Sequence, residues 1–331
     1  MSAKMTPKKV AILRFSSIGD IVLISPVIRA LHASGTYELH FVTKRTFAQV
    51  NLNNKYLKKQ HLFDIDPKEI LPLLKEQDFH FVVDLHKNIR SKRLVRALGV
   101  KSATFPKLNI EKWLLVNFKI DRLPDRHIVD RYMEAIQSLD HQRDYAGLDM
   151  FIAADQSIDL DIHDLQANNY MVFVLGAAHF TKRIPNSILQ TLIQRTSGKI
   201  ALIGGPAEQA QGEELSALDR DRVVNFCGST SLQQSAYLIQ QSSHVLTADT
   251  GMMHIAAAFH KRIVVLWGNT IPKLGMYPYY GQHPNLATHF EVHDLSCRPC
   301  SKIGFQSCPK GHFDCMMQQD VDGVLASLLA Y

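Results

Sequence analysis

The chain has 331 residues, of which 46% are hydrophobic and 21% are charged, and its formal net charge is +6. This composition supplies a sizeable core and excludes a wholly disordered chain. No apolar run approaches the roughly 18 residues that cross a bilayer, and Val10 to Leu13 is too short for a signal-peptide core. We therefore expect a cytoplasmic protein of two domains, whose five cysteines are reduced thiols or metal ligands.

Short apolar runs alternate with helical stretches through the first half of the chain, which is typical of a parallel sheet built from α/β units. The pattern predicts strands at 9–14, 38–43, 61–64 and 79–85, and helices at 20–32, 44–50, 67–77, 90–98 and 126–139. Periodicity is lost from 140 to 169, which we interpret as the boundary region. The predicted domains are therefore residues 1–160 and 161–331.

The same alternation resumes in the second half and predicts a second doubly wound unit. Its predicted strands are 170–175, 199–203, 223–226, 244–247 and 262–267, and its predicted helices are 186–196, 207–218, 232–241, 255–259 and 320–330. We expect the last helix either to stay with this domain or to pack back on the first. Ligands bind at the carboxyl ends of the strands in such sheets, so two tandem sheets are expected to face a central cleft.

Charge is unevenly distributed between the halves. Residues 1–155 carry 25 Lys and Arg against 17 Asp and Glu, whereas residues 156–331 carry 12 against 14. A basic run contributes to this difference and comprises Lys87, Arg90, Lys92, Arg93, Arg96 and Lys101. No acidic residue occurs from Leu85 to Ile110. The run is either a solvated helix face or a docking surface for an anionic lipid, where each basic residue adds about 1 kcal/mol.

The loop after the first predicted strand places a carboxylate at a strand-to-helix junction. Its sequence, Ser16-Ser17-Ile18-Gly19-Asp20, has one glycine and lacks Gly-Lys-Ser/Thr, so it is neither a dinucleotide-binding fingerprint nor a P-loop. Asp20 either stabilises the first turn of a helix by about 1 kcal/mol or acts as a general base that raises a rate by roughly 10²–10⁴.

A second strand-to-helix junction is Asp249-Thr250-Gly251-Met252-Met253-His254. The free N–H groups and the positive dipole at a helix start form a generic phosphate site. Gly251 allows close approach of a ligand, and Thr250 can cap the helix or bind a phosphate oxygen. The stretch is either a capped helix with a partly buried His254 or a phosphate site.

Two further loops follow predicted strands. The first, residues 176–183, ends in Lys182 and Arg183, which either neutralise a diphosphate leaving group without a metal or form a solvated basic pair. The second, residues 204–208, ends in Glu208, which either complements a helix dipole or binds ribose hydroxyls.

In this order, these segments resemble the heptosyltransferases of glycosyltransferase family 9, which act in lipopolysaccharide core assembly. The resemblance covers nearly the whole chain. It rests on residues 12–20, Asp84-Leu85-His86, Thr181-Lys182-Arg183, residues 204–208, Gly228-Ser229-Thr230-Ser231-Leu232 and residues 249–254.

The resemblance implies a GT-B fold, inverting chemistry and an ADP-heptose donor held mainly by the second domain. It implies that Asp20 is the base and that the acceptor side, in the first domain, includes Ser17, Gly19, Lys87, Arg90 and Arg93. For the donor it implies Thr181, Lys182, Thr250 and Gly251 at the diphosphate, Glu208 at the ribose, Thr230 in the loop near the adenine, and Asp249 and His254 at the sugar.

No cofactor or metal is predicted for this transfer. The Asp-x-Asp sequence Asp159-Leu160-Asp161, a candidate for binding a metal–nucleotide complex, falls in the boundary region rather than at a strand end. A separate feature is Cys297-x2-Cys300-x7-Cys308-x6-Cys315, whose spacing fits a structural zinc site, although such tails also occur in relatives not described as zinc proteins.

We therefore predict a cytoplasmic enzyme, peripheral to the inner membrane, that moves a heptose from ADP-heptose to an inner-core sugar of a lipid A/Kdo-type lipopolysaccharide. Another donor or acceptor, and a nucleotide-binding regulator without catalysis, are the alternatives. A zinc-dependent nucleic-acid binder is a third, and it predicts salt-dependent oligonucleotide binding that we do not expect.

Overall fold

The structure is a computed structural model and describes residues 7–330. The chain divides into two compact units that exchange segments. Unit 1 contains the chain up to Lys107, Arg126–Phe151 and Gly281–His283, and unit 2 contains Leu108–Asp125, Ile152–Tyr280 and the chain from Pro284 onward. The chain passes from unit 1 to unit 2 after Phe151, close to the predicted boundary at residue 160. Two segments depart from that boundary: residues 108–125 belong to unit 2, and residues 281–283 belong to unit 1.

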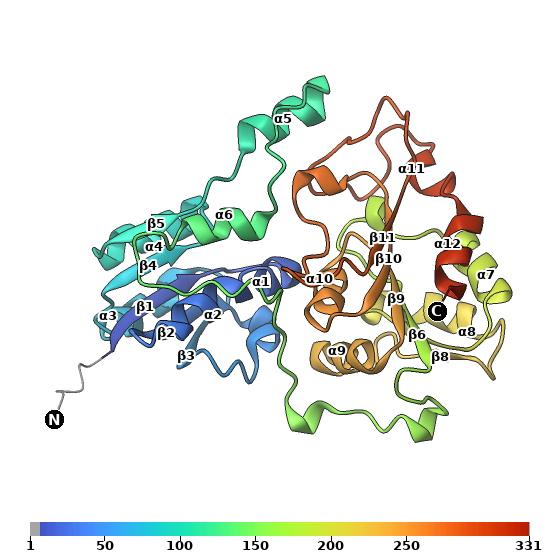
Figure 1. Ribbon diagram of the computed structural model, residues 1–331, viewed down its shortest axis with the longest axis horizontal. Helices are drawn as coiled ribbons and strands as arrows, with labels where there is room; N and C mark the ends of the chain where they lie inside the picture. The colour runs from blue at the N-terminus through green and yellow to red at the C-terminus, as the bar shows by residue number, and fades with distance from the viewer. Residues whose placement is uncertain (1–6, 331) are drawn as a thin grey trace. The chain divides into compact units, whose positions relative to one another are not determined.

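Unit 1 is built on a parallel sheet of five strands in the order β3-β2-β1-β4-β5 (Figure 1). The strands are β1 Lys8–Leu13, β2 Tyr37–Lys44, β3 Lys59–Phe63, β4 Phe81–Asp84 and β5 Ser102–Thr104. Its helices are α1 Ile18–Val22, α2 Ser25–Ala33, α3 Leu71–Lys75, α4 Ile89–Leu98 and α6 Ile128–Glu134, with 3₁₀ turns at Arg45–Asn51 and Pro67–Ile70.

Unit 2 contains a parallel sheet of six strands in the order β11-β10-β9-β6-β7-β8 (Figure 1). The strands are β6 Tyr170–Val174, β7 Lys199–Ile203, β8 Val223–Asn225, β9 His244–Ala248, β10 Arg262–Trp267 and β11 Ala287–Glu291. Its helices are α5 Asn109–Phe118, α7 Asn186–Arg195, α8 Gln209–Ser216, α9 Leu232–Gln241, α10 Gly251–Ala258, α11 Asp314–Met317 and α12 Val321–Leu329.

The predicted alternation of strands and helices is confirmed in both units. The apolar runs form central parallel strands, because such strands are buried on both faces of the sheet. Phe173 and Leu246 are fully buried in the core of unit 2, and Leu13 and Val82 are fully buried in that of unit 1. The last helix, α12, belongs to unit 2, where Val324, among others, joins its hydrophobic core.

The predicted helix 20–32 is divided into α1 and α2 by the residues around Pro26. Proline has no N–H, so it cannot donate to the carbonyl of Val22 four residues earlier. The Ser25 hydroxyl donates to that carbonyl instead, at 2.7 Å. The break ends α1 soon after Asp20 and leaves this residue in a helix of only five residues.

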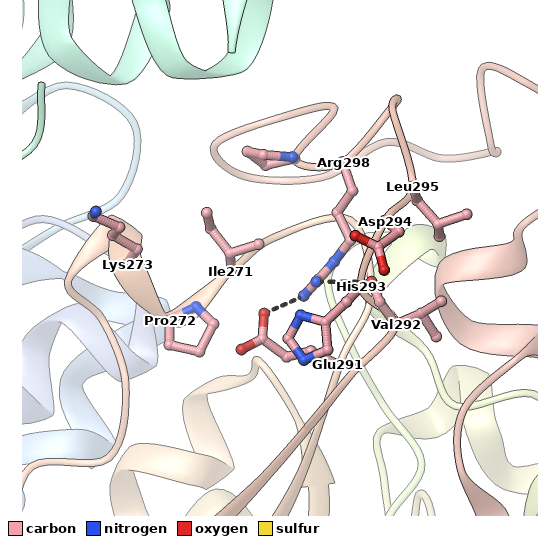
Figure 2. A pocket seen from close by; sticks show the side chains of 10 residues that line it. Ile271, Pro272, Lys273, Glu291, Val292, His293, Asp294, Leu295 and Arg298 are labelled. Carbon is pink, nitrogen blue, oxygen red and sulfur yellow. Dashed lines mark hydrogen bonds and ion pairs between the residues drawn. The ribbon is translucent and has the colours of Figure 1, made fainter. Parts of the chain in front are cut away.

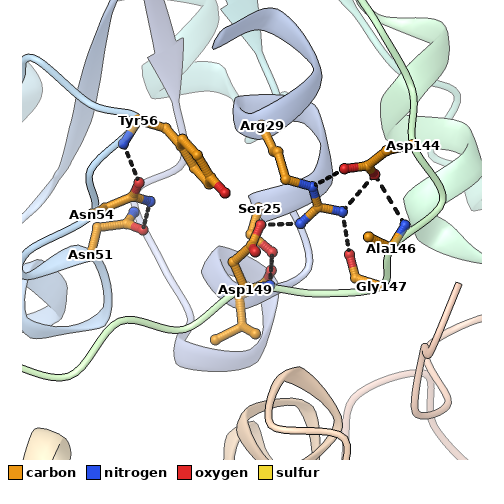
Figure 3. A network of polar contacts seen from close by, with 10 residues as sticks. Ser25, Arg29, Asn51, Asn54, Tyr56, Asp144, Ala146, Gly147 and Asp149 are labelled. Atoms are coloured by element: carbon orange, nitrogen blue, oxygen red, sulfur yellow. Dashed lines mark hydrogen bonds and ion pairs between the residues drawn. The ribbon is translucent and has the colours of Figure 1, made fainter. Parts of the chain in front are cut away.

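Buried polar contacts fix the segment that follows α6 in unit 1 (Figure 3). The guanidinium of Arg29, on α2, donates to both carboxylate oxygens of Asp144 at 2.7 and 2.9 Å, to the carbonyl of Gly147 at 2.8 Å, and to Asp149. The arginine side chain is 10% exposed. These hydrogen bonds attach the irregular chain beyond residue 140 to helix α2.

Candidate active site

Each sheet has one point where the strand order reverses, and parallel sheets of this kind bind ligands outside the strand carboxyl ends at such a point. In unit 1 this point lies between β1 and β4, and in unit 2 it lies between β6 and β9. The loop containing Asp20 follows β1, whereas the loops containing Lys182 and Asp249 follow β6 and β9. The sheet topology of each unit therefore gathers the residues that were predicted to carry the chemistry.

In unit 1, Asp20 is held by an arginine from the end of the same strand. A guanidinium nitrogen of Arg14 lies 2.6 Å from Oδ1 of Asp20, and the two side chains are 10% and 20% exposed. The Ser17 hydroxyl donates to Oδ2 at 2.9 Å, and the Tyr132 hydroxyl from α6 lies 3.5 Å from Oδ1. Both oxygens of the carboxylate are thus oriented, and Gly19 beside it is buried.

The environment of Asp20 favours the ionised carboxylate. Burial is the largest influence on its pKa and acts to raise it, but the positive charge of Arg14 and the hydrogen bonds from Ser17 and Arg14 together lower it below its usual value. The same burial and the neighbouring Asp20 raise the pKa of the Tyr132 phenol, so its hydroxyl stays protonated. The pair therefore offers a charged acceptor beside a neutral donor.

Arg14 also connects the two strands at this point of the sheet. Its guanidinium donates to the Leu85 carbonyl at 2.5 Å, to the Ser16 carbonyl at 2.8 Å and to the Tyr132 hydroxyl at 3.1 Å. The sequence analysis included Arg14 in residues 12–20, which carry the family resemblance, but gave it no role. It did not single out Tyr132, which lies on a helix far along the chain.

In unit 2, Lys182 is paired with Asp249 across the reversal point. Their charged atoms are 2.6 Å apart, and the side chains are 16% and 13% exposed. The Thr270 hydroxyl, after β10, donates to the same Asp249 oxygen at 2.7 Å. Two predicted donor residues from separate loops are therefore in direct contact, and Thr270 is a third participant that the sequence did not indicate.

Glu208 is buried and held in a fixed position beside the same loops. Its carboxylate accepts from the Gly205 N–H at 2.9 Å and lies 3.1 Å from a guanidinium nitrogen of Arg183. A Cβ added at Gly176 would lie 3.1 Å from the carboxylate, and one at Gly204 would lie 2.8 Å from the Glu208 Cβ. A side chain at Gly204 would displace Glu208, and one at Gly176 would crowd its carboxylate. Glu208 links the ends of β6 and β7.

The remaining predicted donor residues are placed differently. Thr181 is 1% exposed, and its hydroxyl exchanges hydrogen bonds with the backbone of Phe305 at 2.9 and 3.3 Å. The Thr230 hydroxyl is bonded to Ser235 at 2.8 Å, at the start of α9. Both hydroxyls are thus engaged with their own unit.

The start of α10 has the backbone geometry that was predicted for a phosphate site. Thr250 is its extended N-cap residue and makes no side-chain cap, since its hydroxyl is bonded to Thr247 at 3.1 Å. Gly251 is the first residue of the helix, and His254, one turn along, is 2% exposed. The first-turn N–H groups are therefore not satisfied by a capping side chain.

The predicted acceptor-side cations lie in the loop before α4 and on α4 itself. Lys87 donates to the Phe105 carbonyl at 2.7 Å, and Arg90 donates to the Ile65 carbonyl at 3.1 Å. Arg93 is exposed, as are Lys92 and Arg96 on the same helix. Lys87 and Arg90 thus brace the loop, and the three exposed residues form the basic face of α4.

An open pocket of about 430 Å³ lies at the carboxyl ends of β10 and β11 in unit 2 (Figure 2). Arg298 forms one wall, and it pairs with Glu291 at 2.7 Å and donates to the carbonyls of Gly268 and Thr270 at 2.6 and 2.9 Å. The arginine therefore fixes the loop that carries Thr270. Lys273 on the opposite wall is paired with Asp121.

The four cysteines of the carboxyl-terminal segment are free thiols, and Cys315 among them is buried. Within residues 7–330, no three His, Cys, Asp or Glu side chains gather in a way that could hold a metal ion. The zinc interpretation of the cysteine spacing is therefore not supported by the arrangement of these side chains. None of the helices in this range is long and apolar enough to cross a membrane.

Comparison with known proteins identifies the family. Residues 70–305 match the model of glycosyltransferase family 9 (heptosyltransferase). Lipopolysaccharide heptosyltransferase 1 of Pseudomonas aeruginosa is 24% identical over 322 residues, which cover 89% of this chain and 86% of that protein. Lipooligosaccharide heptosyltransferase 2 of Haemophilus influenzae is 38% identical over 78 residues, a stretch that spans only 22% of each protein.

The fold is shared with solved structures. The structure of Escherichia coli ADP-heptose lipopolysaccharide heptosyltransferase II aligns with a TM-score of 0.71 at 17% identity, covering 97% of this chain and 98% of that one. The two parallel-sheet α/β units thus form a GT-B fold, as predicted from the sequence.

Proposed function

The chain belongs to glycosyltransferase family 9 (heptosyltransferase), and from this premise we propose that it moves a heptose from ADP-heptose to an inner-core sugar of lipopolysaccharide with inversion at the anomeric carbon. The observation that carries the proposal is the family match over residues 70–305. That range does not include Asp20, so the choice of base rests on the geometry of the loop after β1.

In the proposed reaction, a hydroxyl of the acceptor attacks the anomeric carbon of the heptose on the face opposite to the diphosphate. The new C–O bond forms as the bond to the diphosphate oxygen breaks, and the hydroxyl proton passes to the carboxylate of Asp20. Arg14 and Ser17 orient this carboxylate and keep it ionised before the reaction. ADP is the leaving group.

The departing diphosphate gains negative charge, and unit 2 supplies the groups that stabilise it. Lys182 offers an ammonium group, and Thr250 and Gly251 offer N–H groups at the start of α10. Lys182 is paired with Asp249, so the diphosphate takes the place of this carboxylate beside the lysine. Asp249 is then free to accept a hydroxyl of the heptose, and Glu208 accepts the ribose hydroxyls.

This division of roles makes unit 1 the acceptor side and unit 2 the donor side. The exposed basic face of α4 supports peripheral attachment to the anionic cytoplasmic surface of the inner membrane, where the lipid-linked acceptor is found. The acceptor is thereby delivered to the unit that carries Asp20.

The test is transfer by the purified full chain with ADP-heptose and heptose-free lipopolysaccharide, followed by the mass of the product and the release of ADP. We expect one heptose to be added, and Asp20→Ala to lower the rate by roughly 10²–10⁴. Asp64→Ala is the matched control, because this exposed aspartate is paired only at the surface with Arg45.

ADP binding separates the two parts of the proposal. The thermal shift caused by ADP should be equal in wild type and Asp20→Ala, because the nucleotide is assigned to unit 2. Absence of stabilisation by ADP and by a panel of ADP-sugars would exclude the donor, whereas full transfer by Asp20→Ala would exclude Asp20 as the base.

A further inference from the structure

His86 follows the carboxyl end of β4, one of the two strands between which the strand order of unit 1 reverses. In the pairing of β1 with β4, Leu13 lies opposite Asp84, and the chain beyond each strand continues side by side, as the hydrogen bond from Arg14 to the Leu85 carbonyl shows. The ring of His86 packs on that of Phe15, with 4.6 Å between their centres. The imidazole therefore stands beside the loop that contains Asp20.

The backbone around His86 is fixed by a buried carboxylate. Asp84 is 4% exposed and accepts hydrogen bonds from the N–H groups of His86 and Lys87 at 3.0 and 2.8 Å. Its other oxygen accepts from the Ser91 hydroxyl at 2.8 Å. Held by this carboxylate and by Phe15, the imidazole is pre-organised in the way that a ligand-binding side chain needs.

The two ring nitrogens of His86 have no hydrogen-bond partner in the part of the chain that the structure describes, and only Nδ1 is buried. A buried N–H without a partner is more costly than a buried lone pair, so the proton belongs on Nε2, the nitrogen that solvent can reach. Burial, and next the charge of Arg14, lower the pKa of His86 to about 3, so the ring is neutral at physiological pH.

We propose that His86 binds the acceptor sugar, and that its Nε2–H donates a hydrogen bond to an acceptor oxygen close to the hydroxyl that Asp20 deprotonates. This inference rests on the proposed function. A neutral imidazole that stands beside the loop of Asp20 and keeps one N–H open to solvent fits a group that positions a polyhydroxylated ligand. It does not fit a second base, because a ring that stays neutral beside Arg14 has little affinity for a proton.

The test compares two substitutions in steady-state transfer. His86→Met removes the donor and keeps an apolar side chain against Phe15, whereas His86→Gln places an amide N–H near the position of Nε2. We expect His86→Met to raise the KM for the acceptor about five- to tenfold, as the loss of one ligand hydrogen bond does. His86→Gln should restore it to within about twofold.

Three measurements distinguish a binding role from a structural one. The KM for ADP-heptose, the ADP-induced thermal shift and the melting temperature should be unchanged in both variants. His80→Met is the matched control, since this exposed histidine precedes the same strand and is joined to Lys9 through its backbone N–H rather than its side chain. The pH profile of kcat should keep its shape in His86→Gln.

The outcomes separate this inference from the function on which it rests. An active wild type with the same acceptor KM in His86→Met, or an equal rise in the KM values for both substrates, would overturn the role of His86 alone. Absence of transfer by the wild type would overturn the proposed function and this inference with it.

Discussion

Replacing Arg14 with methionine is expected to raise the pKa of Asp20 and to move the acid limb of the rate profile to higher pH. Burial is the largest influence on that pKa and acts upward, whereas the charge of Arg14 is the largest influence that acts downward. Arg14→Met removes this charge and leaves the carboxylate buried. The upward effect of burial then prevails over the remaining hydrogen bonds from Ser17.

The magnitude follows from how deeply the pair is buried. With side chains 10% and 20% exposed and charged atoms 2.6 Å apart, the pair belongs with buried rather than surface ion pairs. Removing one partner from a buried pair costs about 3–5 kcal/mol. We expect a loss at the lower end of this range at pH 7, because Asp20 can still accept hydrogen bonds from Ser17.

The loss should itself depend on pH. In the wild type the lowered pKa of Asp20 contributes stability that is present above the unfolded value and disappears as the pH falls through the folded one. In Arg14→Met the raised pKa destabilises the folded state at neutral pH, and this effect disappears as Asp20 gains a proton. The difference between the two proteins is therefore largest at neutral pH and shrinks in acid.

Urea unfolding at pH 7 and pH 4.5 measures the stability, and the pH dependence of kcat/KM measures the ionisation of Asp20 in the free enzyme. Arg14→Lys is the control, because it keeps the charge and should keep the acid limb close to that of the wild type. An acid limb that stays in place in Arg14→Met, with an equal stability loss at both pH values, would refute this account of the pair.

Three further predictions concern other charged groups. Lys182→Met should weaken ADP binding by about 10- to 150-fold in calorimetry, as loss of a charge-assisted hydrogen bond does, whereas Lys199→Met should not; equal affinities would contradict the diphosphate assignment. Arg29→Met should cost about 3–5 kcal/mol in urea unfolding, against at most about 1 kcal/mol for the exposed Arg195→Met, and similar losses would show that the Asp144 cluster is not structural. Neutralising the basic face of α4 should lower co-sedimentation with anionic vesicles by about 1 kcal/mol per residue, and unchanged binding would exclude this face as the docking surface; the residues are Lys92, Arg93 and Arg96.

The sheet strands and the loops at their carboxyl ends could be predicted because they depend on local signals. Apolar runs such as 10–13 and 170–174 are buried on both faces of a parallel strand, so their positions are visible in the sequence. Two of the four edge strands, β5 and β11, could not be found in this way. β5 is only three residues long with exposed ends, and β11 is half-buried along its whole length, so neither forms an apolar run.

Pairings between side chains from distant elements were not predictable. Tyr132 reaches Asp20 across 112 positions of the chain, and Thr270 reaches Asp249 from another strand. Neighbours in sequence also separate in space: Lys182 faces Asp249, whereas Thr181 beside it is buried against the backbone of Phe305. A sequence motif indicates which residues lie in the same loop. Which of their side chains are available to a ligand depends on tertiary packing.

The two units handle charge at their reversal points in the same way. Arg14 with Asp20, and Lys182 with Asp249, are each largely buried and each compensated within its own unit. A buried charge without a partner costs several kcal/mol, so a protein that needs a cation or a base inside a site must pair it until the ligand arrives. On the proposed function, binding of ADP-heptose replaces the ion pair between Lys182 and Asp249 with one between Lys182 and the diphosphate. The affinity for the donor therefore reflects the difference in free energy between these two ion pairs. The same pairing favours ligands that carry at least as much negative charge as Asp249, which a diphosphate does and a neutral sugar does not.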